Sequence, residues 1–168
     1  MNGDVTLASA STNTLTLNDH LVLVTGSNFT TPISGQQGYM ITGTDLAAST
    51  SLTSNTAYNF STVNLPYGVW MLMGQIGYTN IHASTTTVVT VKQVSINNVS
   101  ATTTSKYLYR ANYTSNLTTA IPNNNDSYSR IVTVTTSNEP YYLVGMLTWT
   151  GGTLVSSTAT NFYAVRIA

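Results

Sequence analysis

The chain has 168 residues, no cysteine and a formal net charge of zero, and only 6% of its residues are charged. This length fits one domain with at most a small appendage. A chain with zero net charge has no long-range field to attract nucleic acid or an anionic membrane, so neither is expected as a partner. Without cysteine, disulfides and thiolate metal sites are excluded.

The composition is typical of an all-β protein. The chain contains 32 Thr, 18 Ser and 17 Asn. Threonine favours strands, whereas asparagine and serine favour turns, and runs of helix-forming residues are absent. Polarity must therefore come from hydroxyl and amide groups. A protein with zero net charge is poorly soluble as a free monomer, which matters less inside an assembly.

Residues 1–35 differ from the rest of the chain. Three short apolar pieces, 5–7, 15–17 and 21–24, are separated by Ser, Thr, Asn and Gly. They are consistent either with an irregular arm of edge strands or with the last turns of a stem-like β segment, such as a fibre shaft. The first residues carry no signal-peptide pattern. The longest apolar run, Val69–Met73, is too short to cross a membrane, so no membrane insertion is expected.

From residue 36 the pattern predicts longer strands and clear turns, which defines a second region, 36–168. About eight strands without helices are typical of an antiparallel β-sandwich. The expected strands are 38–42, 57–65, 69–78, 86–99, 106–113, 128–136, 141–150 and 161–168.

Two of these strands are apolar on both faces. In 69–78, Trp70 and Leu72 alternate with Val69 and Met71, and strand 141–150 repeats the pattern. One face of an antiparallel sheet is usually solvated, so a second apolar face predicts contact with another copy of the chain. The alternative is that the N-terminal arm covers this face. The aromatic and methionine residues expected in the oligomer interface or the core are Trp70, Tyr78, Tyr142, Met146, Trp149 and Tyr163.

Three short motifs carry a resemblance: Tyr67-Gly68-Val69-Trp70, Gly74-Gln75-Ile76, and the terminal Tyr163-Ala164-Val165-Arg166-Ile167-Ala168. Through these motifs, residues 36–168 resemble the head domains of viral fibre and spike proteins. Those heads are similar to the jelly roll of complement C1q and tumour necrosis factor. The resemblance implies a homotrimer on the virion surface that contacts other virion proteins and attaches to a host. Acidic loop clusters that hold calcium in some such heads are missing here, so no metal is carried over.

Catalytic residues are scarce. The carboxylates are Asp4, Asp19, Asp45, Asp126 and Glu139, and the histidines are His20 and His82. Asp19 and His20 are adjacent, so on a strand they point to opposite faces. No nucleophile elbow, phosphate loop, dinucleotide motif or zinc motif occurs. We therefore expect a non-enzymatic protein without a cofactor.

Aromatic residues and one polar loop suggest binding instead. Tyrosine pairs a flat apolar ring with a polar edge, which suits a sugar or a protein interface. The loop at Asn123, Asn124, Asn125 and Asp126 is the candidate receptor-facing segment. Two functions remain open: a structural virion protein, or a lectin-like or adhesin carbohydrate-binding module of an extracellular cellular protein.

Overall fold

A computed structural model describes residues 37–81, 87–103, 108–117 and 127–168 of the chain, with the backbone alone for 108–117. The chain divides into two compact units, Met1–Thr30 and Thr31–Ala168, and the fold below belongs to the second. The predicted N-terminal arm or stem, residues 1–35, lies outside the described residues.

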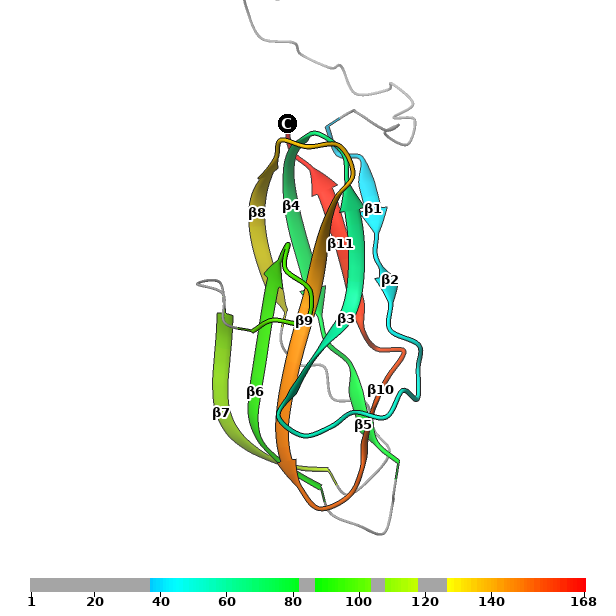
Figure 1. The fold of residues 1–168 in the computed structure, drawn as a ribbon, viewed down its shortest axis with the longest axis vertical. Coiled ribbons are helices and arrows are strands. Elements are labelled where there is room, and N and C mark those ends of the chain that lie inside the picture. Colours follow the sequence, from blue (N-terminus) through cyan, green and yellow to red (C-terminus); the bar gives the residue numbers. More distant parts are fainter. Residues whose placement is uncertain (1–36, 82–86, 104–107, 118–126) are drawn as a thin grey trace, which may run out of the picture. The chain divides into compact units, whose positions relative to one another are not determined.

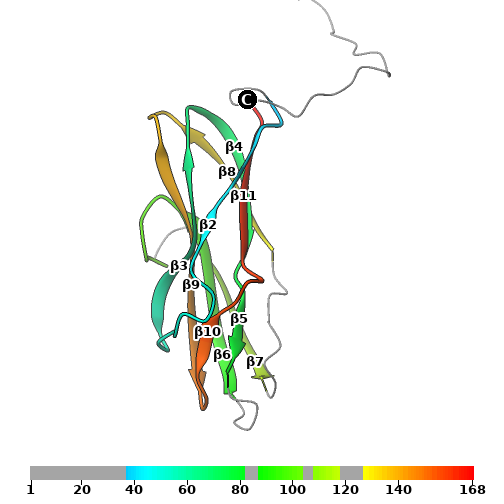
Figure 2. The ribbon, with the colours of Figure 1, turned by 90° about the vertical axis from the view of Figure 1, so that its right-hand side faces the viewer.

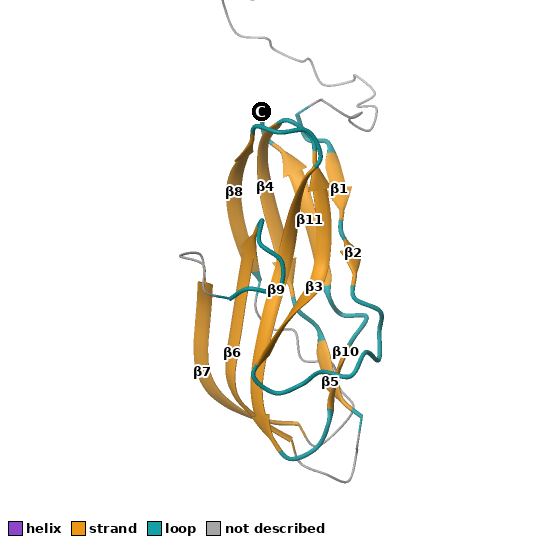
Figure 3. Ribbon diagram, viewed as in Figure 1, coloured by secondary structure: helices purple, strands orange, loops and turns teal. Residues whose placement is uncertain are grey.

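The described residues form strands and loops, with no helix among them (Figure 3). The strands are β1 (Met40–Thr42), β2 (Thr44–Asp45), β3 (Thr56–Leu65), β4 (Gly68–Gln75), β5 (Tyr78–Asn80), β6 (Thr87–Asn97), β7 (Leu108–Leu117), β8 (Tyr128–Val134), β9 (Glu139–Thr150), β10 (Leu154–Ser156) and β11 (Asn161–Arg166).

All strand pairs among them are antiparallel, and the sheets are arranged like a sandwich. A four-stranded sheet has the order β1-β11-β4-β8, and a five-stranded sheet has the order β2-β3-β9-β6-β7 (Figure 1). A third sheet has two strands, in the order β10-β5. Figure 2 shows β11 and β4 in one layer and β3 and β9 in the other. The prediction of an all-β antiparallel protein is confirmed.

The core lies between the two larger sheets. The largest fully buried apolar side chains include Trp70 and Leu72 of β4, Phe60 of β3 and Phe162 of β11. They occupy alternate positions of their strands, as expected when one face of each sheet is buried. The core therefore uses the face of β4 that contains Trp70.

The predicted strands correspond to observed ones, with two differences. The expected strand 69–78 is divided into β4 and β5 at Ile76–Gly77. A Cβ on Gly77 would lie 2.5 Å from the backbone nitrogen of Thr160, so the close approach of these two segments requires glycine. The short strands β2 and β10 were not predicted, because two or three residues carry no visible alternation.

A β-bulge in β6 changes which residues face the core. In β6 the register shifts between Val89 and Val91. Simple alternation along 86–99 places Val88 on the same face as Val94, but Val89 is buried with Val94 while Val88 is half-buried. An extra residue in one strand reverses the alternation beyond it, which explains the difference.

The terminal strand β11 lies inside a sheet rather than at its edge. It pairs with β1 along Met40–Thr42 and with β4 along Trp70–Gln75. Beyond β11, the backbone nitrogen of Val69 donates to the Ala168 carbonyl at 2.7 Å. The last residues of the chain therefore hold together the middle of the four-stranded sheet.

Deletion of residues 163–168 is expected to abolish folding. It removes most of β11, leaving the backbone groups of β1 and β4 without their partners and removing the buried Ala164. Deletion of residues 1–30 is expected to leave a folded domain. Circular dichroism and thermal melts of both variants check this. A folded C-terminal truncation beside an unfolded N-terminal one would contradict it.

Gly145→Ala is expected to lower the free energy of unfolding by about 1–3 kcal/mol through overpacking. A Cβ there would lie 2.7 Å from Phe60 Cε2 and 2.9 Å from Ile76 Cδ1. Thr150→Ala, at an exposed position of the same strand, is the control and should change stability by less than about 0.5 kcal/mol. Urea denaturation at one protein concentration measures both. Equal midpoints for the two variants would disprove the close packing at Gly145.

Candidate functional site

An apolar row crosses the outer face of the four-stranded sheet. Cross-strand register places Met40, Val165, Met71 and Ile131 side by side, from the β1 edge to the β8 edge. Met40 is 57% exposed and Ile131 is 64% exposed, while the two central residues are half-buried. No other described segment covers these two edge residues, so the row is open to solvent or to a partner.

The next row on the same face is more polar. It consists of Thr42, Tyr163, Met73 and Ser129, again in direct register. Asn161 and Gln75 follow as the next pair on β11 and β4. The face therefore changes along the strands, from apolar near the start of β4 to hydroxyl and amide groups near its end.

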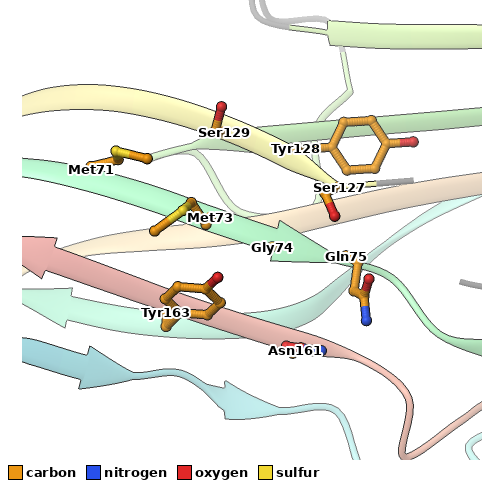
Figure 4. Close-up of a pocket in the computed structure, with 9 residues that line it drawn as sticks. All are labelled: Met71, Met73, Gly74, Gln75, Ser127, Tyr128, Ser129, Asn161 and Tyr163. Atoms are coloured by element: carbon orange, nitrogen blue, oxygen red, sulfur yellow. The ribbon is translucent and has the colours of Figure 1, made fainter. Parts of the chain in front are cut away.

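A hollow of about 370 Å³ lies at this polar end (Figure 4). The hollow combines two methionines, two tyrosines and several uncharged polar groups. Its lining residues are Met71, Met73, Gly74, Gln75, Ser127, Tyr128, Ser129, Asn161 and Tyr163. None of these nine residues carries a formal charge at neutral pH. We call it the Tyr163 hollow.

A second hollow, of about 310 Å³, lies on the other side of Tyr163. It is lined by residues of β1, β2 and β11, among them Met40, Thr42 and Tyr163, and it includes the carboxylate of Asp45. Tyr163 therefore forms a ridge between two depressions of one sheet face. Of these two hollows, the Tyr163 hollow has no charged side chain among its lining residues, and the second has Asp45.

The outer face of the five-stranded sheet is different, because residues 98–103 cover part of it. Asn97 Nδ2 donates to the Thr102 carbonyl at 3.1 Å, and the Ala101 nitrogen donates to Asn59 Oδ1 at 2.7 Å. Under this segment Ser95 and Asn97 are buried. Asn59 and Asn97 on this face are thus hydrogen-bonded within one chain, whereas Met40 and Ile131 on the four-stranded sheet stay exposed.

Three cations pack against aromatic rings inside the fold. Lys92 is fully buried, and its Nζ lies 5.8 Å from the ring centres of both Tyr78 and Tyr128. Arg130 lies 6.0 Å from the Tyr141 ring, and Arg166 lies 5.8 Å from the Trp70 ring. Contacts of this kind stabilise a cation in a partly desolvated setting. They give these residues a structural role.

The residues predicted for an interface or core fall into two groups. Trp70 and Tyr78 are completely buried in the core of the single chain. Tyr142, Met146, Trp149 and Tyr163 are half-buried, and Trp149 packs against the core. Tyr163 alone among the six lines the hollows. The predicted receptor-facing loop, Asn123, Asn124, Asn125 and Asp126, lies outside the described residues.

Sequence reasoning missed Met40 and Ile131, the two most exposed residues of the apolar row. Each is the only large apolar residue that its strand presents on the outer face, so neither strand shows an apolar stripe. Their importance comes from register across four strands. A single sequence contains no signal for this pairing.

Chemistry-bearing groups are not brought together in the described part of the chain. Of the predicted titratable residues, Asp45 is exposed and Glu139 is half-buried, while Asp4, Asp19, His20, His82 and Asp126 are outside the described residues. Searched over the same residues, the structure has no group of three potential metal ligands. It also contains no helix long and apolar enough to span a membrane within those ranges.

Comparison of the chain with models of known protein families gave no match, and comparison with curated proteins also gave none.

Proposed function

We propose that this chain is the head domain of a homotrimeric fibre or spike at the surface of a virion, without enzymatic activity, that attaches the particle to its host. The open apolar row Met40–Val165–Met71–Ile131 carries the proposal. The trimer forms through this row. Residues 1–35 join the head to the rest of the fibre and to other virion proteins.

The strand pairing supports a jelly roll as the finer description of the fold. Setting aside the short strands β2, β5 and β10, eight strands remain. The first pairs with the last (β1–β11), the second with the seventh (β3–β9), the third with the sixth (β4–β8) and the fourth with the fifth (β6–β7). Such nested pairing is that of one long hairpin folded over into two sheets, which is the jelly-roll pattern.

Composition supports a second copy of the chain as the partner of the apolar row. Exposed contiguous apolar surface marks an interaction site on a soluble protein. The row carries no charge, and neither does the row beside it, so two copies meet without burying an unpaired ion. A chain with zero net charge has little electrostatic repulsion between copies.

The second candidate is a lectin-like or adhesin module of an extracellular cellular protein. The Tyr163 hollow favours it, because an aromatic ring beside amide and hydroxyl groups suits a sugar. A monomer in solution that binds a glycan would favour this alternative over the fibre head. A stable trimer with a host ligand favours the fibre head.

Ile131→Asp is expected to convert the trimer to a folded monomer. The substitution places a charge in the proposed contact, at the β8 end of the apolar row, where it is desolvated without a partner. Sedimentation at micromolar concentration should show a species of three chains for the wild type and one chain for the variant. Circular dichroism should show the same strand content for both.

Val99→Asp is the matched control. Val99 is 57% exposed, close to the exposure of Ile131, and lies just beyond the end of β6, away from the four-stranded sheet. The same charge there should leave the trimer intact. A wild-type chain that sediments only as an 18.0 kDa monomer would disprove the proposed assembly.

A further inference from the structure

We infer that the Tyr163 hollow is a binding site for a neutral saccharide. This inference rests on the proposed attachment role, to which it adds a site and a ligand class. The volume of about 370 Å³ lies within the range of about 300–1,000 Å³ that is common for small-molecule sites.

The hollow has an aromatic and thioether surface on which the C–H face of a sugar ring can lie. Tyr163 on β11 and Met73 on β4 are direct cross-strand partners, and Figure 4 shows their side chains next to each other on adjacent strands. Met71 continues this surface on β4. Both strands are central in the sheet, so the position of the surface is fixed by pairing on both sides.

Uncharged polar groups lie around this surface. Gln75 Nε2 donates to the Ala159 carbonyl at 3.4 Å, which orients the amide at one end of the hollow. The side chains of Asn161, Ser127, Ser129 and Tyr163 make no hydrogen bond to another described residue. Amides and hydroxyls both donate and accept, as the hydroxyl groups of a sugar require.

The charge of the lining selects among sugars. No lysine, arginine or histidine is among the nine lining residues, so the hollow offers no counter-charge to a carboxylate or sulfate. The chain as a whole has a net charge of zero and attracts no anion from a distance. A neutral hexose or N-acetylhexosamine therefore fits better than an acidic sugar.

The polar end of the hollow fits a saccharide better than it fits a second copy of the apolar row. Met40 and Ile131 of another chain would cover Asn161, Ser127 and Ser129 without offering them hydrogen bonds. Burying a polar group without a hydrogen-bond partner is unfavourable. The apolar row and the hollow meet at Met71, so one sheet face serves the trimer at one end and the ligand at the other.

The methionine methyl groups allow a direct test. The chain has five methionines, Met1, Met40, Met71, Met73 and Met146. These methyl groups are labelled with ¹³C for NMR. Glucose, galactose, mannose and N-acetylglucosamine are then each titrated into the protein to millimolar concentrations. At least one should shift the Met73 and Met71 signals and leave Met146 unchanged. N-acetylneuraminic acid, the charged probe, should shift neither.

Variants of the lining test the site itself. Tyr163→Ala should weaken binding of the active sugar by about tenfold or more, and Tyr163→Phe by much less, because the ring supplies the stacking surface. Gln75→Ala should also weaken binding, and it preserves the ring. Tyr67→Ala is the control, because Tyr67 is 60% exposed and does not line the hollow.

Sedimentation of the same samples separates this inference from the proposed function. A trimer whose Met71 and Met73 signals do not respond to any neutral sugar overturns the saccharide site and leaves the trimer standing. Signals that move only when the protein is diluted show that a second copy fills the hollow, which also overturns the site. A monomer that binds sugar overturns the trimer and supports the site.

Discussion

The antiparallel pairing of β11 between β1 and β4 is the constraint on which the described domain depends. It joins β11 to β1, more than 100 positions earlier, and to β4, more than 80 positions earlier, and it closes the middle of the four-stranded sheet. The same strand supplies Phe162 and Ala164 to the core and Tyr163 and Val165 to the outer face. Since neighbouring residues of a strand point to opposite faces, core and candidate site are fixed by a single register.

The scarcity of charge shapes the rest of the structure. Asparagine side chains hold loops in place by hydrogen bonds, where other proteins often use ion pairs. Asn59 Nδ2 donates to Ser100 Oγ at 2.8 Å, and Asn59 Oδ1 accepts from the Ala101 nitrogen. The few described cations pack against aromatic rings. Hydrogen bonds between neutral groups carry no long-range field. They hold these loops without adding positive or negative charge to the surface.

Alternation predicted the strands well because most of them are long and bury one face in the core, as β4 does with Trp70 and Leu72. It failed where the period is interrupted. The bulge at Val89/Val91 exchanged the faces of β6, and the two-residue β2 was too short to show a period. Of the residues that line the candidate site, Tyr163 was named from the sequence, but as an interface or core residue. Gln75, Asn161 and Ser129 were not, because they become neighbours only through the pairing of β11, β4 and β8.

The candidate site lies on the strands of a sheet. The predicted receptor-facing loop at residues 123–126 lies outside the described residues, and the hollow is formed largely by β4, β8 and β11. Side chains on paired strands are held by the sheet beneath them, so Tyr163 and Met73 need little ordering when a ligand arrives. This face is divided chemically: hydroxyls and amides lie at one end, and methionine, valine and isoleucine lie at the other. Each half can then change by substitution of outward residues, while the inward residues of the same strands keep the core.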